Sequence, residues 1–197
     1  MPRAFDTREQ TSIRESLQEA GARLFRAKGV LKTTIDDLAS AAGVAKGSFY
    51  KFYDSKELLF FEILEGLHER LRAPLLMANK DARSRRHFEK LLRKLLLQIS
   101  DEPLILFMGR EDELQAVLRR VKPERLRDHE RKDQAFIDNL IASWTDRKAP
   151  PSRDVVAARL TAVLLVCLRR DFVGKRLFPL ALDAGVESLA NCFFEPE

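Results

Sequence analysis

Apolar residues recur at a spacing of three and four positions along almost the whole chain of 197 residues. Ile13, Leu17, Ala20 and Leu24 form one such stripe, and this period is typical of an α-helix with one buried face. No stretch shows the alternation that a half-buried strand would need. The pattern therefore predicts an all-α fold of about nine helices. We expect them over residues 8–28, 34–43, 46–52, 55–74, 84–100, 103–120, 123–147, 152–174 and 179–194.

The chain is predicted to divide into two regions of different character. Residues 1–57 contain short helices joined by tight turns, whereas residues 58–197 contain long helices with wide apolar faces. Gly29 and Gly43 fall where helices of the first region end, a position that glycine favours. We expect a small head domain over residues 1–57 and a larger helical domain over residues 58–197.

Composition and cysteine usage exclude several classes of protein. Lys and Arg total 35 against 30 Asp and Glu, and this net charge of +5 permits a nucleic-acid partner without requiring one. Cys167 and Cys192 stand in apolar surroundings and rule out a disulfide-framework fold. The first ten residues lack the apolar core of a secretory signal, and the longest apolar run, Ala162–Leu168, is too short to cross a bilayer. We therefore expect a cytoplasmic protein with buried thiols and no membrane partner.

No pattern in the sequence nominates a metal, a cofactor or an enzymatic reaction. His68, His87 and His129 are isolated from one another and lack a second ligand at metal-binding spacing. The sequence contains neither a glycine-rich phosphate loop nor a nucleophile elbow. We therefore expect no cofactor, no metal site and no catalytic residue.

The stretch from Thr33 to Lys56 carries the most specific signal in the chain. Ala39 is small enough for a close helix crossing, Gly43 supplies a tight turn, and Val44 would fill the angle between two helices. Two short helices joined in this way form a helix-turn-helix, whose second helix enters the major groove of DNA in many regulators. The same spacing also occurs in purely structural corners between helices, so spacing alone leaves both interpretations open.

The second helix of this motif, over about residues 45–52, suits DNA recognition. Gly47 would allow another backbone to approach closely, and Phe49 and Phe52, three residues apart, would anchor the helix inward. The side chains that can donate hydrogen bonds are those of Lys46, Ser48, Tyr50 and Lys51.

The residues of this region also resemble the TetR/AcrR family of transcriptional regulators. The resemblance extends over residues 9–65, which is a minor part of the chain, and its motifs are highly specific. It rests on Ala20, Leu24-Phe25, Lys28-Gly29, Thr33-Thr34-Ile35, Leu38-Ala39, Ala42-Gly43-Val44, Lys46-Gly47-Ser48-Phe49-Tyr50 and Ser55-Lys56-Glu57-Leu58.

The resemblance implies a three-helix DNA-binding head and a larger helical domain that binds a small molecule and forms a homodimer. Thr34 would cap its helix and touch a phosphate, and Lys56 would bind a phosphate. Ser48, Tyr50 and Lys51 would face base edges or the DNA backbone. The implied DNA-facing residues are Thr34, Lys46, Gly47, Ser48, Tyr50, Lys51 and Lys56.

Three positions depart from the pattern of the family. Phe52-Tyr53 stands in place of an aromatic residue or His followed by Phe, so either Tyr53 turns its hydroxyl outward from a core position or Phe52 lacks a phosphate contact. Asp54 stands where Pro is common. Asp36 occupies a position where a basic or polar residue often contacts DNA, and its carboxylate would repel a phosphate.

The larger region contains candidates for a dimer interface. The centre of the predicted helix 152–174 is apolar all round and needs cover on two faces, of which a partner subunit could supply one. Together with the last helix it would form a four-helix interface about a two-fold axis, although the same pattern also fits the core of a monomer. The expected interface residues are Leu160, Val163, Leu164, Cys167, Leu182, Val186, Leu189 and Phe193.

Aromatic residues are plentiful in the first half of the larger region and would suit a cavity for a mostly apolar ligand. The same side chains could simply fill a core. The residues that we select as candidate pocket lining are Phe107, Met108, Phe136 and Trp144.

Together these features predict a homodimeric repressor that binds a palindromic operator in double-stranded DNA and is released by an unidentified small molecule. Two alternatives stay open at this point. One is a regulator or activator controlled by a protein partner without a small-molecule effector, against which a ligand-sized cavity would argue. The other is an all-α ligand-binding protein that does not bind DNA, against which salt-dependent DNA binding would argue.

Overall fold

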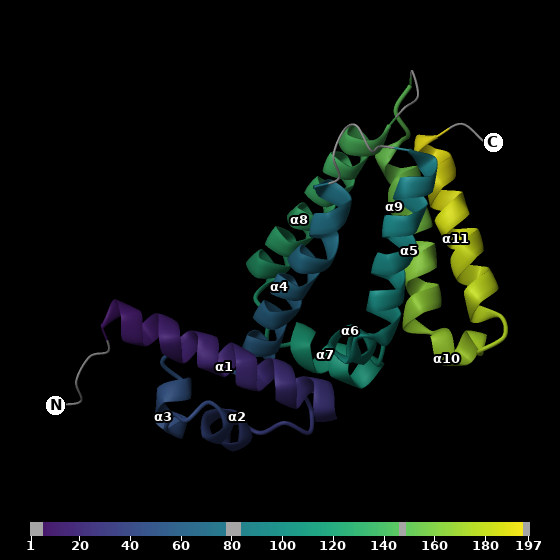
Figure 1. Ribbon diagram of the computed structural model, residues 1–197. Coiled ribbons are helices and arrows are strands. Elements are labelled where there is room, and N and C mark those ends of the chain that lie inside the picture. The colour runs from purple at the N-terminus through teal and green to yellow at the C-terminus, as the bar shows by residue number, and fades with distance from the viewer. Residues whose placement is uncertain (1–5, 78–83, 146–148, 195–197) are drawn as a thin grey trace. The chain divides into compact units, whose positions relative to one another are not determined.

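The structure is a computed structural model that describes residues 6–77, 84–145 and 149–194. Within these residues the chain forms eleven helices and no strand, so the predicted all-α fold is confirmed (Figure 1). The helices are α1 (Thr7–Lys28), α2 (Ile35–Ala41), α3 (Lys46–Phe49), α4 (Lys56–Leu76), α5 (Arg85–Asp101), α6 (Pro103–Met108), α7 (Glu111–Leu118), α8 (Pro123–Trp144), α9 (Arg153–Leu168), α10 (Arg170–Val173) and α11 (Phe178–Phe193).

Two of the predicted helices are each divided in two. Residues 103–120 form α6 and α7, which separate at Gly109, whose N–H bonds back only three residues to the Leu106 carbonyl at 3.1 Å. Residues 152–174 form α9 and α10, which separate at Arg169, where the backbone leaves helical geometry with φ −114° and ψ 26°. Periodicity did not reveal the break at Arg169, because Leu168 and Phe172 keep the helical spacing across it.

Pro74 does not end its helix, as the sequence led us to expect, but lies inside α4, which continues to Leu76. A proline removes one N–H from the helical ladder and usually kinks or ends a helix. Here the last turn still closes, because the Met77 N–H bonds to the Ala73 carbonyl at 2.9 Å.

Contacts within the chain group it into two compact units. The first unit comprises the chain up to Leu67 together with Pro103–Pro123, and the second comprises His68–Glu102 together with the chain from Glu124 onward. The first unit therefore contains α1 to α3, the beginning of α4, and the pair α6 and α7. The predicted functional boundary between residues 57 and 58 stays a prediction.

The core of the first unit is apolar and partly aromatic. Leu17, Phe25 and Phe60 are fully buried, and the rings of Phe25 and Phe60 meet edge to face with centroids 5.4 Å apart. Gly21 allows α1 to approach α4 closely, since a Cβ there would lie 2.8 Å from the Ile63 side chain. These contacts fix α1 against the start of α4.

The core of the second unit is built around aromatic side chains from α5, α8 and the end of α11. The Phe88 ring lies 5.1 Å from that of Trp144 and 5.0 Å from that of Phe193. Trp144 is 1% exposed, and its indole N–H donates to the Leu75 carbonyl at 2.7 Å. Burial of several large rings with a satisfied indole N–H gives this unit a well-specified core.

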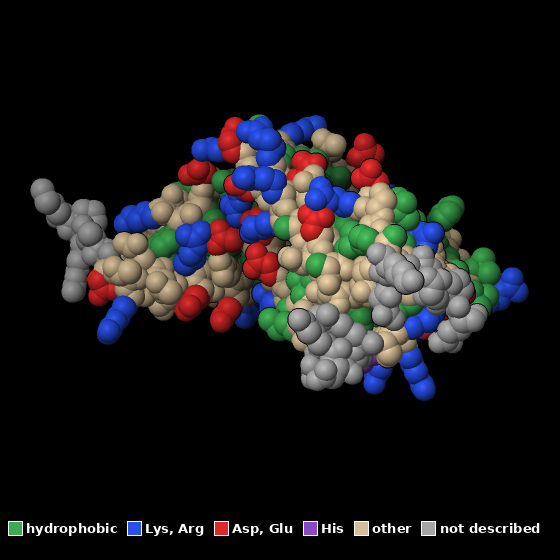
Figure 2. All heavy atoms as spheres, turned by 90° about the horizontal axis from the view of Figure 1, so that it is seen from above, with side chains coloured by type: hydrophobic (Ala, Val, Ile, Leu, Met, Phe, Trp, Pro, Cys, Tyr) green, Lys and Arg blue, Asp and Glu red, His purple; other side chains and the backbone are tan. Residues whose placement is uncertain are grey.

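The outer surface carries charges of both signs. Figure 2 shows Lys and Arg side chains interspersed with Asp and Glu over the face that it presents, in keeping with a net charge of only +5. Among the described residues, none of the helices has the length and apolar character that a membrane-spanning segment requires.

Most of the residues expected at a dimer interface lie instead in the core of the chain itself. α9 and α11 pack against each other within one subunit, so closely that a Cβ at Gly185 would overlap the Val163 side chain. Leu160 and Leu164 are half-buried. The six that are buried are Val163, Cys167, Leu182, Val186, Leu189 and Phe193. The helical stripe that these residues form correctly indicated burial. They are covered by other helices of the same chain, however, and not by a partner subunit.

Both cysteines are free thiols in the interior, as predicted. Cys167 is fully buried, and burial raises the pKa of its thiol to about 11. The thiolate is the reactive form of cysteine, so Cys167 is chemically inert near neutral pH.

A pair of histidines lies between α4 and α8 in the second unit. The rings of His68 and His129 are 5.4 Å apart, and Arg72 forms an ion pair with Asp133 at 2.9 Å beside them. The His68 Nδ1 is buried and has no hydrogen-bond partner among the described residues. Burial, with smaller contributions from Arg72 and His129, lowers the pKa of His68 to about 4.

We expect this histidine to make the protein less stable in mild acid. The folded chain keeps His68 neutral down to about pH 4, whereas the unfolded chain takes up a proton near pH 6.5. The free energy of unfolding therefore has its full value above the pKa of His68 in the unfolded chain. It falls as the pH drops toward 4, by about 2 kcal/mol between pH 7 and pH 5. Urea unfolding at these two pH values measures the loss. Between pH 7 and pH 5 the His68→Phe variant should lose about 2 kcal/mol less stability than the wild type. An identical pH dependence in both proteins would contradict the lowered pKa of His68.

Candidate nucleic-acid interface

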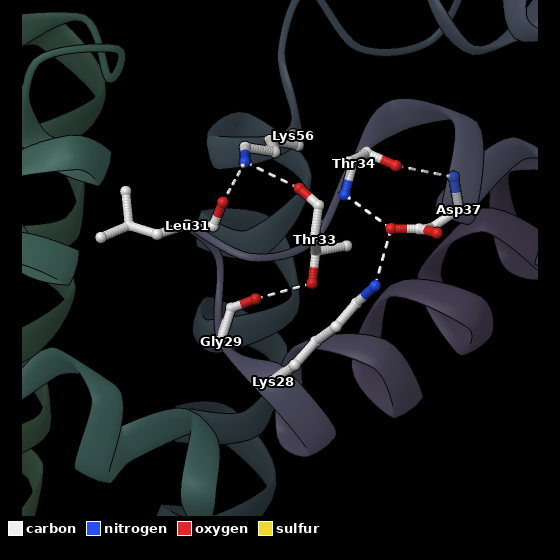
Figure 3. A network of polar contacts seen from close by, with 7 residues as sticks. All are labelled: Lys28, Gly29, Leu31, Thr33, Thr34, Asp37 and Lys56. Carbon is white, nitrogen blue, oxygen red and sulfur yellow. Dashed lines mark hydrogen bonds and ion pairs between the residues drawn. The ribbon is translucent and has the colours of Figure 1, made fainter.

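The N-terminus of α2 is capped as the sequence predicted. The Thr34 hydroxyl oxygen accepts from the Asp37 N–H at 3.1 Å, and the Asp37 carboxylate accepts from the Thr34 N–H at 2.9 Å. The Lys28 ammonium lies 2.7 Å from the same carboxylate (Figure 3). The hydrogen bond from Lys28, followed by those from Thr34, holds the pKa of Asp37 well below its usual range. The cap fixes the direction in which α2 starts, and it leaves Thr34 on the surface.

The turn from α2 to α3 also follows the prediction. Gly43 adopts φ +70°, which favours glycine, and the Val44 N–H returns to the Ala39 carbonyl at 2.9 Å. Ala39 is 3% exposed, so this small side chain is buried within the motif. The helix-turn-helix is therefore present with the expected turn residues.

α3 is anchored by Phe49 and exposes the residues around it. Phe49 is fully buried, whereas Tyr50 is 50% exposed, and their rings meet edge to face at 5.7 Å. The regular helix ends at Phe49, three residues earlier than predicted, and the chain continues with an i→i−3 bond from Lys51 N–H to the Ser48 carbonyl at 3.1 Å. Phe52 is half-buried, in partial agreement with its predicted inward anchor role.

The structure brings the predicted recognition residues together on this short segment. Lys46, Gly47 and Lys51 are exposed along with Tyr50, and Ser48 is half-buried. A Cβ at Gly47 would meet no atom within 4 Å, and the backbone there does not have positive φ. Nothing in the described part of the chain therefore requires glycine at position 47.

Asp36 forms an ion pair with Lys46 that the sequence did not reveal. The Lys46 ammonium lies 2.9 Å from the Asp36 carboxylate on the surface of the motif. The hydrogen bond that the Lys46 ammonium donates to the Asp36 carboxylate is the main cause that raises the pKa of Lys46. Asp36 thus neutralises one of the cations that we expected to face DNA.

The Asp36→Asn variant should bind DNA more tightly. Removing the carboxylate frees Lys46 for a phosphate and removes a negative charge near the DNA, so we expect affinity to rise about threefold to tenfold, since exposed ion pairs contribute only up to about 1 kcal/mol. The salt dependence should steepen, with a slope more negative by up to about 1 for each subunit. Fluorescence anisotropy at several salt concentrations measures both effects, with Asp54→Asn as a control exposed acid nearby. Equal affinity and slope in the Asp36 variant and the wild type would show that the ion pair does not compete with DNA.

Lys56 was expected to bind a phosphate, but here its ammonium contacts the turn before α2. It donates to the Leu31 carbonyl at 3.1 Å and to the Thr33 carbonyl at 2.7 Å (Figure 3). An ammonium group has three donors, so one is left over for a phosphate. Lys56 therefore positions the turn whether or not it also contacts DNA.

Tyr53 is part of the core and points its hydroxyl into a polar network. The residue is 4% exposed, and its hydroxyl donates to the Glu62 carboxylate at 3.0 Å. Arg14 binds the same carboxylate through two nitrogens, at 3.0 and 2.7 Å. Burial, followed by the charge of Glu62, raises the pKa of Tyr53 to about 12. This network joins α1 to α4, and the sequence pattern gave no signal of it beyond the tyrosine itself.

The four candidate pocket residues do not gather around a common cavity within either unit. Phe107 and Met108 belong to the first unit, and Phe136 and Trp144 to the second. The Arg110 guanidinium lies 4.7 Å from the Phe107 ring centre, the Arg72 guanidinium lies 4.9 Å from that of Phe136, and Trp144 is in the core. A surface hollow of about 570 Å³ in the second unit has a different lining, formed by Leu71, Lys90, Arg93, Lys94, Leu97, Gln98, Asp101 and Glu102.

Residues 17–63 match the sequence model of the family described as "Bacterial regulatory proteins, tetR family". The helix-turn-helix of this chain is that of the TetR family. The matched range contains α2, α3 and the capped turn between α1 and α2, so the predicted family is confirmed at the helix-turn-helix.

Curated proteins similar to part of this chain are named as transcriptional regulators. The "HTH-type transcriptional repressor KstR2" of Rhodococcus jostii is 43% identical over 65 residues, which cover 33% of this chain and 32% of that protein. The "HTH-type transcriptional regulator TtgR" of Pseudomonas putida is 35% identical over 96 residues, which cover 48% of this chain and 44% of that protein. The matches thus span less than half the length of these curated relatives. Both relatives are named as transcriptional regulators and not as enzymes.

The fold of the whole chain is also that of TetR-family structures. A TetR transcriptional regulator from Rhodococcus sp. RHA1 superposes with a TM-score of 0.66 at 15% identity and covers 96% of this chain and 100% of its own. At this identity the likeness shows the fold alone.

Proposed function

We propose that this TetR-family chain acts as a homodimeric repressor that binds a palindromic operator in double-stranded DNA. In this proposal α3 enters the major groove, and two copies read half-sites about 34–36 Å apart or a multiple of that distance. A small, mostly apolar effector binds the second unit and lowers the affinity for DNA.

The surface of α3 carries the proposal. Phe49 is buried and fixes the helix to the head, while Tyr50 and Lys51 are exposed beside it. Gly47 has open space around it. Glycine would be needed at this position if a ligand outside the chain approached the backbone closely. A DNA duplex is such a ligand when α3 lies in its major groove.

The remaining exposed residues are assigned to phosphate and base contacts. Lys51 and the third donor of Lys56 would bind phosphates, and Lys46 would do so in competition with its ion pair to Asp36. The hydroxyl of Thr34 would add a neutral contact at the start of α2. Ser48 and Tyr50 would face base edges or the DNA backbone. Phosphate contacts of this kind set position and salt dependence, whereas base contacts set specificity.

The dimer interface is assigned to exposed apolar side chains of α9 and α11 in place of the buried ones. On α9, Val155, Ala158, Ala162 and Leu165 are exposed at spacings of three, four and three residues, and Leu165 is 55% exposed. Beside α11 the corresponding exposed residues are Leu177, Leu180 and Ala184. Such stripes on two neighbouring helices suit a two-fold four-helix contact, and an exposed apolar patch of this kind calls for a partner.

Release of DNA by the effector is a shift between two conformations of the dimer. The effector must bind the conformation with low DNA affinity more tightly than the other, because equal affinity for both would shift nothing. By reciprocity, operator DNA must then weaken effector binding by the same factor.

Equilibrium binding to duplex DNA in increasing salt tests the proposal. A dimer that neutralises several phosphates should lose affinity with a slope of about −0.9 per phosphate on a log–log plot. A specific complex should resist competition by unrelated duplex at salt that abolishes nonspecific binding. Affinity that is independent of salt, or that does not discriminate between sequences, would contradict a specific regulator.

A further inference from the structure

The turn between α1 and α2 is held by charged side chains from two other helices. The Glu113 carboxylate, on α7, accepts from the Val30 N–H at 3.0 Å and from the Leu31 N–H at 3.1 Å. Lys56, at the start of α4, donates to the carbonyls of Leu31 and Thr33 at 3.1 and 2.7 Å. The Lys56 ammonium therefore binds carbonyl groups of this turn, and the Glu113 carboxylate binds its N–H groups.

Glu113 is a buried acidic residue, and the neighbouring backbone leaves room for its carboxylate. It is 5% exposed, and a carboxylate removed from water needs hydrogen bonds such as these to remain there. Gly29 has φ +79°, and a Cβ at that position would overlap the Glu113 carboxylate and lie 3.2 Å from the Phe107 ring. Glycine at position 29 thus leaves room for the carboxylate as well as for the turn.

The clamped turn leads directly into the DNA-binding motif. Thr33 is fully buried, and its hydroxyl donates to the Gly29 carbonyl at 2.6 Å. The next residue, Thr34, is the N-cap of α2, and α2 packs on α3. A displacement of the turn would therefore move both helices of the motif.

Glu113 also has a distinctive place along the chain. The segment 103–123 that carries it belongs to the first unit, yet α5 precedes it and α8 follows it, and both lie in the second unit. A rearrangement at the end of α5 or the beginning of α8 reaches this segment through the covalent chain. Glu113 provides two hydrogen bonds between the segment and the head.

We infer that Glu113 is a positioning residue for DNA binding, through which the segment 103–123 holds the α1–α2 turn and with it the recognition helix. The inference rests on the proposed function, since it assigns to Glu113 a part in setting operator affinity. Glu113 itself contacts no DNA.

The experiment compares the full-length wild type with Glu113→Gln, and uses Glu111→Gln as an exposed control on the same helix. Operator affinity is measured by fluorescence anisotropy at several salt concentrations, and amide exchange at Val30 and Leu31 is followed by NMR. For Glu113→Gln we expect at least a tenfold loss of affinity, an unchanged salt slope because no phosphate contact is lost, and faster exchange of both amides. Glu111→Gln should stay within twofold of the wild type.

Several results would overturn the inference, and they are distinguishable from failure of the proposed function. If Glu113→Gln is folded and binds the operator within twofold of the wild type, the carboxylate serves stability alone. If that variant does not fold, Glu113→Asp keeps the charge but withdraws the carboxylate by one methylene, and wild-type affinity in this variant would also overturn the inference. If the wild type itself binds no duplex specifically, the proposed function fails and the inference fails with it.

Discussion

Replacing Tyr50 by Ala is expected to abolish specific operator binding while the helix content and the dimer stay intact. Tyr50 is half exposed and rests on the buried ring of Phe49, so its removal leaves no cavity in the core. A good side-chain contact to a base edge contributes about 1–3 kcal/mol, and a two-fold dimer makes each contact twice, so specific affinity should fall by about a hundredfold or more. Anisotropy with operator and with unrelated duplex measures the specific and nonspecific terms separately.

Tyr53→Phe is the matched control, since Tyr53 is the other tyrosine of the chain and its hydroxyl is bonded within the core to Glu62. Its loss should lower the free energy of unfolding by about 1 kcal/mol and leave specific DNA affinity unchanged. Unchanged specific affinity in Tyr50→Ala would mean that α3 does not read the operator through this residue.

Replacing Leu165 by Glu is expected to convert the dimer to a monomer. Leu165 is 55% exposed in the single chain, so the acid is tolerated in the isolated subunit. In the proposed interface it would be buried without a partner, twice, at a cost of several kcal/mol. The mass measured by light scattering at low micromolar concentration should halve, and operator affinity should fall because a monomer reads one half-site.

Leu97→Glu is the control for this substitution. Leu97 is a 40% exposed leucine on another helix, α5, and its replacement should leave the mass unchanged. A dimeric mass for Leu165→Glu would contradict the interface on the exposed stripe. Loss of the dimer in both variants would point to a contact that includes α5.

Local sequence signals predicted the DNA-binding motif well because its geometry is encoded locally. The cap formed by Thr34 and Asp37 spans three residues, and the turn depends on one glycine with positive φ at position 43. Contacts of this range leave a pattern in the sequence. The hydrogen bond that the Val30 N–H donates to the Glu113 carboxylate crosses 83 residues and leaves no such pattern.

The exposed apolar stripe on α9 shows why helical periodicity alone does not locate an interface. A helical period identifies the apolar face of a helix, but it does not say whether the same chain or a partner covers that face. On α9, Val163 and Cys167 are covered by the chain itself, whereas Leu165 is left exposed. These apolar residues differ only in the direction in which they point around the helix. The packing of α11 against α9 determines which of them are buried.

Long side chains were the least predictable part of the candidate site. Lys46 is paired with Asp36, and Lys56 is bonded to backbone carbonyls of a preceding turn. A lysine beside a helix-turn-helix suggests a phosphate contact from sequence alone, yet an ammonium on a flexible stem can also satisfy acceptors within the protein. Only the three-dimensional arrangement separates these uses.

Selection of bound fragments from the genomic DNA of the source organism, at two salt concentrations, tests whether the protein is a dimeric operator-specific repressor. We expect one short palindromic motif to survive at the higher salt, with half-sites separated by about one helical turn or a multiple of it. Recovery of fragments only at low salt, with no common motif, would reveal nonspecific phosphate binding and contradict a dimeric operator-specific repressor.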